Sequence, residues 1–496
     1  MSEHDGSRWH HRWQDIVVAS SGTFIEWFDF MVYGYLAATI AKVFFPGESE
    51  SLALLATFAT FAVGFIGRPF GGLFFGNLGD RIGRKRTLVL TVALMTVPMF
   101  GIAVLPSEAS IGVAAPILLV IARLIQGFAV GGEYTGVITY LVEEAPAGRR
   151  GWTANLGASM ASNLGTFGAA FVVAVLTWVL NDEQLVAWGW RVPFALGGVL
   201  ALVSLRFRGH MRESQAFVDV ATEEDARELE LRVPSSSTPL ADTGTVQGVA
   251  EKPEQPVVRA LRNNFRAILV VFLLHAYVGT TTYVVISFLP PYLTTVLGVP
   301  DEQASFVAVS VAVVMTIAPP FFGLWSDRIE SRVKPLIATA VGFTVLSYPM
   351  FALFGTANIG VILLAQLPLV ALLALQMAVF VPFVAELFPT AERYSGLSVG
   401  YNFGAVLGGS APMIATALIH TTGSNLAPAF YIAGFSVVML PMLLQLRETA
   451  NLAVPELGRG DIFRHRHGHR HGHRHGHRQS QRHRTAPAAA HDSDGG

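Results

Sequence analysis

The stretch GNLGDRIGRKR, residues 76–86, follows an apolar block, and GLWSDRIESRVK, residues 323–334, follows another apolar block in the second half of the chain. Each stretch begins with Gly, continues to Asp-Arg-Ile and ends in basic residues. In the second copy, Glu330 stands where the first has Gly83, so the repeat is imperfect. A loop repeated at equivalent places in two halves predicts an internally duplicated fold.

The sequence around these loops consists of apolar blocks. The 496 residues are 52% hydrophobic and only 14% charged, whereas a soluble globular protein carries about 25% charged residues. A helix needs about 20 apolar residues to cross a bilayer, and backbone in lipid must satisfy its own hydrogen bonds, so each block is predicted to be a helix. There are twelve such blocks: 15–40, 52–76, 87–105, 112–141, 152–180, 189–206, 266–292, 303–325, 335–354, 359–386, 395–419 and 427–446.

The blocks predict an all-α membrane protein of twelve transmembrane helices in two six-helix repeats. The expected parts are an N-terminal segment 1–14, a first bundle 15–206, a linker 207–265, a second bundle 266–447 and a disordered tail 448–496. The linker contains ATEEDARELELR, typical of a solvated helix, and then PSSSTPLADTGT, typical of flexible chain.

The tail carries alternating His and Arg between His465 and Arg484. Neutral imidazoles would bind zinc or nickel ions, and the His and Arg side chains together would bind anionic lipid head groups. The alternative is a dispensable disordered tail, and no metal site is predicted from it.

Basic residues alternate from side to side along the chain. Short loops on one side carry Arg81, Arg84, Lys85, Arg86, Arg149, Arg150, Arg328, Arg332 and Lys334. The opposite loops carry mainly acids: Glu48, Glu50, Asp182, Glu183, Asp301 and Glu302. Since positively charged loops stay in the cytoplasm, both termini and the linker are predicted to be cytoplasmic in a multi-pass protein of the plasma or inner membrane.

Further stretches carry a family resemblance. GNLGDRIGRKR resembles the loop signature of the major facilitator superfamily. EWFDFMVYG (26–34), RPFGGLFFGNLGDRIGR (68–84), RLIQGFAVGGEYTG (123–136), WGWRVPF (188–194) and ELFPTAERYSG (386–396) resemble its metabolite:proton symporter family. APILLVIARLIQGFAVGGEYTG and the closing RETAN look most like the proline/betaine branch, while IAKVFFPGESE also suits the citrate branch. The resemblance implies alternating access driven by a proton gradient.

Five charged residues lie inside apolar blocks: Glu26, Asp29, Arg68, Arg123 and Glu133. Each costs about 2.5–3.5 kcal/mol at the centre of a membrane helix on insertion scales. They must therefore face a wet cavity or pair with one another. Structural ion pairs are one interpretation, and binding of a solute or a proton is the other.

The functional interpretation gives each residue type a role. A carboxyl group would carry the proton, an arginine fork suits a carboxylate, and aromatic rings suit a quaternary ammonium. The expected pathway consists of Glu26, Asp29, Arg68, Arg123, Glu133, Trp27, Tyr33, Gln126, Tyr134, His275, Tyr283 and Asn402. The alternatives are packing for the aromatic residues, a structural hydrogen bond for the histidine, and packing or a hinge for the asparagine.

The charges of the repeated loops have their own expected role. The resemblance implies that Asp80 and its neighbours hold the cytoplasmic side closed in one conformation. The expected gating residues are Asp80, Arg81, Arg84, Arg86, Asp327 and Arg328. The alternative is that these charges only orient the helices, although orientation alone does not require an acid.

The predicted function is proton-coupled uptake of a small carboxylate-bearing or zwitterionic metabolite such as proline or glycine betaine. The alternatives are a di- or tricarboxylate or shikimate symporter, an efflux antiporter, and a sensor that does not transport. No metal-ligand cluster, nucleophile elbow or phosphate loop occurs, and the chain has no cysteine, so an enzyme is not expected. The expected partners are the solute, protons and the bilayer, with no cofactor, no nucleic acid, and a monomer as the functional unit.

Overall fold

The computed structural model describes residues 3–46, 50–146, 148–222 and 255–450, together with Leu452 and Phe463. Within this part of the chain, ten helices are long and apolar enough to cross a membrane, and a bent pair, Asp182–Gly189 with Arg191–Arg208, makes an eleventh. The second predicted block, 52–76, lies within α3, a helix of 33 residues. All twelve predicted blocks therefore fall on helical segments.

The first bundle runs from α1 to α10. Its elements are α1 (Glu3–Tyr35), α2 (Ala37–Phe44), α3 (Glu50–Ile82), α4 (Arg84–Ala103), α5 (Glu108–Ile111), α6 (Ala114–Glu144), α7 (Arg150–Ala154), η1 (Asn155–Ser159), α8 (Met160–Val179), α9 (Asp182–Gln184), η2 (Leu185–Gly189) and α10 (Arg191–Arg208).

The second bundle follows a short helix, α12 (Pro256–Asn263). Its elements are α13 (Phe265–Thr282), η3 (Tyr283–Phe288), α14 (Leu289–Pro291), η4 (Tyr292–Val296), α15 (Asp301–Arg328), α16 (Val333–Phe354), α17 (Ile359–Glu386), η5 (Thr390–Glu392), α18 (Arg393–Gly409), α19 (Ala411–Thr422) and α20 (Ala427–Gln445).

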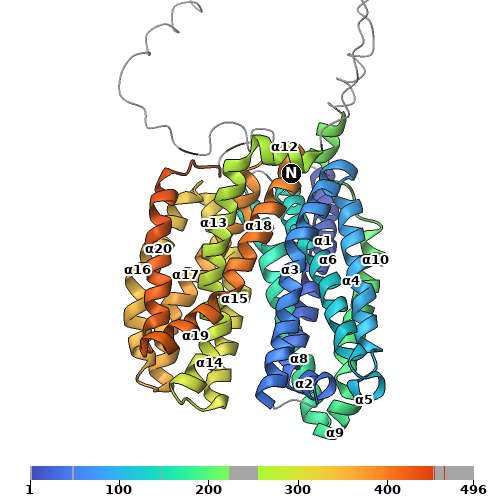
Figure 1. The fold of residues 1–496 in the computed structure, drawn as a ribbon. Helices are drawn as coiled ribbons and strands as arrows, with labels where there is room; N and C mark the ends of the chain where they lie inside the picture. The colour runs from blue at the N-terminus through green and yellow to red at the C-terminus, as the bar shows by residue number, and fades with distance from the viewer. Residues whose placement is uncertain are drawn as a thin grey trace, which may run out of the picture.

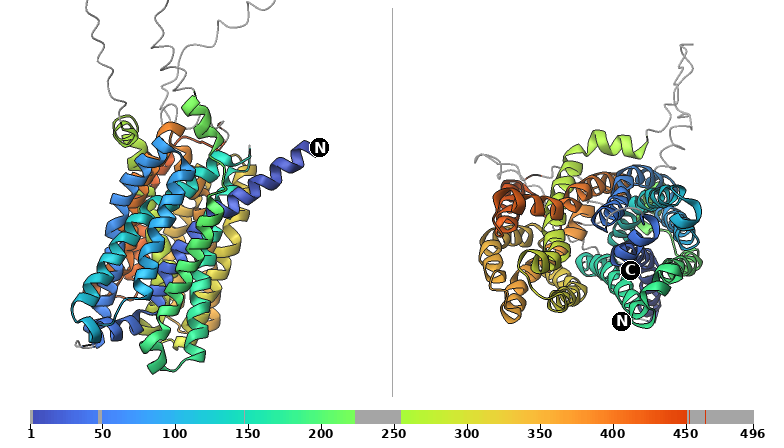
Figure 2. Two further views of the ribbon diagram at one scale, coloured as in Figure 1. Left: turned by 90° about the vertical axis from the view of Figure 1, so that its right-hand side faces the viewer. Right: turned by 60° about the horizontal axis from the view of Figure 1, so that its bottom comes forward.

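The two bundles stand side by side with their helices roughly parallel (Figure 1). A view turned so that the bottom of Figure 1 comes forward shows them as two adjoining helix clusters (Figure 2), whereas α12 lies at the opposite end, at the top of Figure 1. We call the end that carries the exposed Arg81, Arg86, Arg328 and Lys334 the basic end, and the other the far end. The far end carries α5 and α9, at the bottom of Figure 1.

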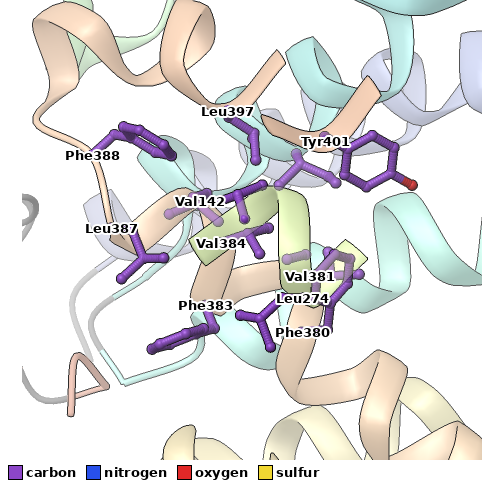
Figure 3. Packing of buried hydrophobic residues seen from close by; sticks show 14 of the residues in the cluster. Val142, Leu274, Phe380, Val381, Phe383, Val384, Leu387, Phe388, Leu397 and Tyr401 are labelled. Carbon is purple, nitrogen blue, oxygen red and sulfur yellow. The ribbon is translucent and has the colours of Figure 1, made fainter. Parts of the chain in front are cut away.

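The apolar cores explain how the bundles are joined. One cluster draws on both bundles, with Val142 of α6 packed in the same group as Leu274 of α13, Val384 of α17 and Leu397 of α18 (Figure 3). Three other clusters each belong to one bundle: two in the first, around Phe28 and around Met95, and one in the second, around Phe351. The shared core holds the halves together toward the basic end.

Glycines bring two helices of the first bundle into backbone contact. A Cβ atom added at Gly71 of α3 would lie 1.7 Å from the carbonyl oxygen of Phe128, and one at Gly127 of α6 would lie 1.9 Å from that of Gly64. Small residues allow this close approach in membrane helices. The second bundle has a similar contact between α13 and α18, where Gly279 meets Gly408.

The boundaries of the predicted linker and tail differ in detail from the structure. Helix α10 continues past residue 206 to Arg208, and residues 215–222 are helical. Glu448 and Thr449 pack on the second bundle through hydrogen bonds. Residues 223–254 and the His/Arg stretch from His465 to Arg484 lie outside the described residues, so the interpretations of those segments stay predictions.

Candidate functional site

Helix α1 presents two acids to two different arginines. Glu26 and Asp29 are one helical turn apart, and both are buried. An Oε1 atom of Glu26 lies 4.0 Å from Nη2 of Arg68 on α3. An Oδ2 atom of Asp29 lies 3.4 Å from Nη1 of Arg123 on α6. The four side chains thus form two separate acid–arginine pairs within the first bundle.

The pair between Asp29 and Arg123 is part of a hydrogen-bonded group. Gln126 donates to Asp29 over 2.8 Å and accepts from Arg123 over 2.9 Å. The Arg123 guanidinium lies over the Tyr33 ring, 3.9 Å from its centroid, and the Tyr33 hydroxyl donates to the carbonyl of Thr57. Several contacts therefore fix the position of this arginine.

The pair between Glu26 and Arg68 is less tightly bound. Its 4.0 Å separation exceeds the length of a charge-assisted hydrogen bond, about 2.7–2.9 Å. The Arg68 guanidinium lies 4.6 Å from the centroid of Phe65 and 5.2 Å from that of Phe30. The ring of Phe30 packs edge-on against the half-buried Trp27. Aromatic rings therefore surround this pair.

Side chains of the second bundle reach the same region. Tyr283, in η3, stacks edge-to-face on Phe65 with 6.5 Å between the ring centroids, and Phe65 in turn lies against the Arg68 guanidinium. Tyr134 of α6 packs on Tyr401 of α18 with 5.3 Å between centroids. Both bundles therefore contribute to the aromatic group beside Arg68.

His275 of α13 packs beside this aromatic group. Its ring stacks on Tyr401 with 3.6 Å between centroids, and its Nδ1 atom is hydrogen-bonded to the Tyr401 carbonyl over 2.5 Å. These contacts are those of a histidine that joins α13 to α18. Its role in a transport pathway stays a prediction.

Glu133 has a partner that the sequence did not indicate. Arg208, at the end of α10, contacts both carboxylate oxygens of Glu133, at 2.5 and 3.0 Å, and Thr91 also donates to this carboxylate. The same guanidinium donates to the carbonyls of Leu88 and Ala19. Because Arg208 lies beyond the sixth apolar block, hydropathy alone assigned it to the linker.

Asn402 lies where the two bundles meet. Its Nδ2 atom donates to the carbonyl of Gly131 on α6 and to that of Ser398 on its own helix, each over 2.8 Å. Thr135 and Ser398 share a further hydrogen bond of 2.7 Å between α6 and α18. These contacts join the halves rather than surround the Glu26 and Arg68 pair.

At the basic end, the first repeated loop forms what we call the Glu143 cluster: Asp80, Arg84, Glu143, Glu213 and Arg393. Asp80 accepts hydrogen bonds from the backbone N–H groups of Tyr394 and Ser395 in the other bundle, at 3.3 and 2.7 Å. Glu143 accepts two bonds from Arg84 and one from Arg393. The cluster therefore bonds α3, α4 and α6 to the start of α18.

The second repeated loop forms the corresponding Glu386 cluster: Arg150, Asp327, Arg332, Glu386 and Glu448. Asp327 accepts hydrogen bonds from the backbone N–H groups of Gly151 and Trp152 in the first bundle, at 2.8 and 2.9 Å. Arg332 lies 3.3 Å and Arg150 lies 3.7 Å from Glu386. In both clusters, the Asp of the repeated loop binds backbone N–H groups of the opposite bundle, and a Glu faces two arginines.

A second repeat completes this symmetry. Glu213 accepts hydrogen bonds from the backbone N–H groups of Arg84 and Lys85 at the start of α4, and Glu448 does the same for Arg332 and Val333 at the start of α16. The residues after them, Ser214 and Thr449, donate to Glu143 and Glu386. The matching triplets RES (212–214) and RET (447–449) encode this arrangement.

The sequence interpretation missed most of these partners, although a signal for them exists. Glu143 precedes Arg150, and Glu386 precedes Arg393, by the same spacing at the same place in each half. Of the expected gating residues, Asp80, Arg84 and Asp327 make contacts between the bundles. Arg81, Arg86 and Arg328 are exposed, and their gating role stays a prediction.

Comparisons with known proteins identify the fold and the family. The model of the family described as "Sugar (and other) transporter" matches residues 16–458. The chain is 37% identical to the Ectoine/proline transporter ProP of Corynebacterium glutamicum, over 86% of this chain and 82% of that protein. It is 33% identical to the Proline/betaine transporter of Escherichia coli (strain K12), over 88% and 83% of the two chains.

A solved structure gives the same result for the fold. The major facilitator superfamily proton:xylose symporter XylE, bound to 6-bromo-6-deoxy-D-glucose, superimposes with a TM-score of 0.72 over 90% of this chain and 98% of that one, at 21% identity. At this identity, the match shows the fold alone. Taken with the family match over most of its length, the chain belongs to the sugar (and other) transporter family; it is a multi-pass transporter with the major facilitator fold, not an enzyme.

Proposed function

We propose that this transporter takes up a small zwitterionic or carboxylate-bearing metabolite, such as proline or glycine betaine, together with a proton. The observation that carries the proposal is the arrangement on α1, where Glu26 and Asp29 each oppose a buried arginine of a neighbouring helix. The two buried pairs would provide separate binding sites for the solute and for the proton. The names of the relatives, which include proline, ectoine and betaine, support the same class of solute.

In this proposal, Asp29 is the proton carrier. Its Oδ2 atom binds Arg123 and Gln126, and among the residues that the structure describes its Oδ1 atom has no hydrogen-bond partner. Protonation of the carboxylate would remove its attraction for Arg123, which must then find another partner. Glu133 is less suited to this role because Arg208 binds both of its oxygens.

The two clusters at the basic end would act as the gate. Asp80 and Asp327 bind backbone N–H groups of the opposite bundle, so these bonds must break whenever the halves separate at this end. The basic end is taken as cytoplasmic, as the placement of Lys and Arg favours. Both chain termini would then be cytoplasmic as well.

The experiment uses right-side-out membrane vesicles with an imposed pH gradient. The solutes are proline, glycine betaine, ectoine, 2-oxoglutarate, citrate and shikimate. We expect accumulation of at least one zwitterion when the outside is acidic, and loss of that accumulation with a protonophore. Expulsion of the solute would indicate antiport, and the absence of movement for every solute would contradict transport of this class.

The role of Asp29 is tested separately. Asp29→Asn should abolish accumulation against a gradient but retain counterflow of labelled solute, which needs no proton gradient. Glu183→Gln is the matched control, since Glu183 is an exposed acid of the far end. Retention of full proton-driven accumulation by Asp29→Asn would contradict the assignment.

A further inference from the structure

We propose that Glu26 and Arg68, with the rings of Phe30, Phe65 and Tyr283, form a clamp for a zwitterion. Arg68 would bind the carboxylate of the solute, and Glu26 would bind its cationic nitrogen. This inference rests on the proposed function, because it identifies the solute site of that transporter. It also assigns the two acid–arginine pairs to different cargoes.

The first argument is the unmet hydrogen-bonding capacity of Glu26. This residue is 2% exposed, and within the described part of the chain its Oε2 atom has no hydrogen-bond partner. The nearest Arg68 nitrogen is 4.0 Å from Oε1. A buried carboxylate with so few partners is unfavourable, and a cationic group bound beside it would satisfy it.

The second argument is the aromatic surroundings of the pair. The rings of Phe30 and Phe65 lie within about 5 Å of the Arg68 guanidinium, and Tyr283 packs on Phe65. Tyr134 and Tyr401 form a further ring pair between the two bundles, with 5.3 Å between their centroids. A quaternary ammonium has no N–H to donate, so aromatic faces next to a carboxylate are the chemistry that recognises it.

The third argument is the position of the pair between the two halves. Arg68 and Glu26 belong to the first bundle, while Tyr283 and Tyr401 belong to the second. A solute held by all of them would contact both bundles, as expected of a site that closes and opens by movement of the halves.

The other pair is less suited to a zwitterion. Gln126 is bonded to both Asp29 and Arg123, and the Tyr33 ring covers one face of the guanidinium. Arg123 retains Nε and Nη2 without hydrogen-bond partners among the described residues, but the carboxylate beside it is already bound by the amide. This difference directs the solute to Glu26 and Arg68 and the proton to Asp29.

The clamp predicts a definite selectivity. A zwitterion adds one positive and one negative charge to a site that already has one of each, so every charge faces an opposite one. A dicarboxylate would place its second negative charge near Glu26, where it is repelled. The neutral carbon analogue of glycine betaine, 3,3-dimethylbutanoate, has the same shape and carboxylate but lacks the cationic nitrogen.

The test measures binding to the purified protein with three probes: glycine betaine, 3,3-dimethylbutanoate and choline. We expect the unmodified protein to prefer glycine betaine. Glu26→Gln should weaken glycine betaine binding by about 10- to 100-fold, the range expected for loss of a charged contact, while leaving or improving 3,3-dimethylbutanoate binding. Arg68→Lys should weaken both carboxylates and spare choline.

Controls separate this inference from misfolding and from the proposed function. The thermal unfolding midpoint of each variant checks its fold, and the double variant Glu26→Gln/Arg68→Gln removes both charges together if a single change fails to fold. Glu183→Gln should match the unmodified protein. Asp29→Asn should keep the preference for glycine betaine over 3,3-dimethylbutanoate.

Two outcomes would overturn the clamp. One is an unchanged preference for glycine betaine over 3,3-dimethylbutanoate in Glu26→Gln, which would leave proton-driven uptake standing with a different solute site. The other is an unmodified protein that binds no zwitterion but accumulates citrate or 2-oxoglutarate with protons. In that case, symport of a carboxylate would survive and the clamp would not.

Discussion

The Glu143 cluster and the Glu386 cluster have equivalent members but unequal bonding. Glu143 receives bonds from Arg84, Arg393 and Ser214, at distances from 2.5 to 3.1 Å. Glu386 receives a bond of 2.6 Å from Thr449 and a longer one of 3.3 Å from Arg332, while Arg150 lies 3.7 Å away. Duplication has preserved the roles of the side chains, but the first copy holds its acid more tightly.

The loop backbones show the same inequality. Gly83 precedes α4 with a φ of 102°, a conformation that glycine adopts freely. Its counterpart Glu330 has a φ of 50°, in the left-handed region that an ordinary side chain disfavours. The second loop therefore keeps its shape despite an unfavourable residue, and we expect the first cluster to dominate the closure of the basic end.

The largest difference in stability between the two clusters should appear when Glu143 or Glu386 loses its charge. Glu143→Gln leaves the buried Arg393 without its carboxylate partner and leaves Arg84 with Asp80 alone. Breaking a buried ion pair typically destabilises by roughly 3–5 kcal/mol. Glu386→Gln should have a smaller effect because its arginines are more distant. Thermal unfolding of the purified variants measures both. A midpoint that falls further for Glu386→Gln would contradict the ranking of the two clusters.

A smaller effect is expected at the acids that bind the opposite bundle. Asp80→Asn and Asp327→Asn each weaken two bonds to backbone N–H groups, and hydrogen bonds to a charged group are worth about 1.5–3 kcal/mol. Each also removes the charge that faces one arginine, Arg84 at 3.2 Å or Arg332 at 2.7 Å. Both should shift the protein toward a state open at the basic end. The chain has no cysteine, so spin labels at Arg86→Cys and Lys334→Cys would report the distance between the bundles.

The control for this measurement is Glu183→Gln, which alters an exposed acid of the far end. It should leave the distance distribution unchanged. If Asp80→Asn also leaves that distribution unchanged, Asp80 does not hold the basic end closed. A response to Asp80→Asn alone would show that the gate depends on the first loop only.

The smallest effects should come from the loop backbones, and they should have opposite signs. Gly83→Ala places a Cβ atom 2.2 Å from Oε2 of Glu213, in a backbone region that costs an ordinary residue about 1–3 kcal/mol. Glu330→Gly relieves left-handed strain of about 1 kcal/mol. The thermal unfolding midpoint should therefore fall for Gly83→Ala and rise for Glu330→Gly. A lower midpoint for both variants would show that Glu330 makes a stabilising contact of its own.

The fold was predictable from the sequence for a physical reason. Lipid requires helices of a minimum apolar length, so each of the twelve predicted blocks falls on helical structure, including α3 and α17. The five charges inside the blocks were equally visible because each is expensive there. Hydropathy could not show which charges pair with one another.

The missed residues lie at the ends of helices. Glu143, Glu386 and Arg208 are close to block boundaries, where a charge is ordinary and hydropathy gives no reason to single it out. Their burial depends on the packing of α6, α17 and α10 against other segments, which a single block does not encode. Only the repeated spacing and the RES and RET triplets carried that information.

The backbone contact between α3 and α6 has a mechanical consequence. The glycine contacts hold α3 and α6 together as one packed pair, which carries Arg68 and Arg123. Helix α1 carries Glu26 and Asp29 and packs most extensively against α8. Both ion pairs therefore bridge the same boundary, with acids on one side and arginines on the other. A sliding displacement of α1 along α3 and α6 would change the Glu26–Arg68 and Asp29–Arg123 distances together. Movement of this one helix would therefore affect the binding of both ions.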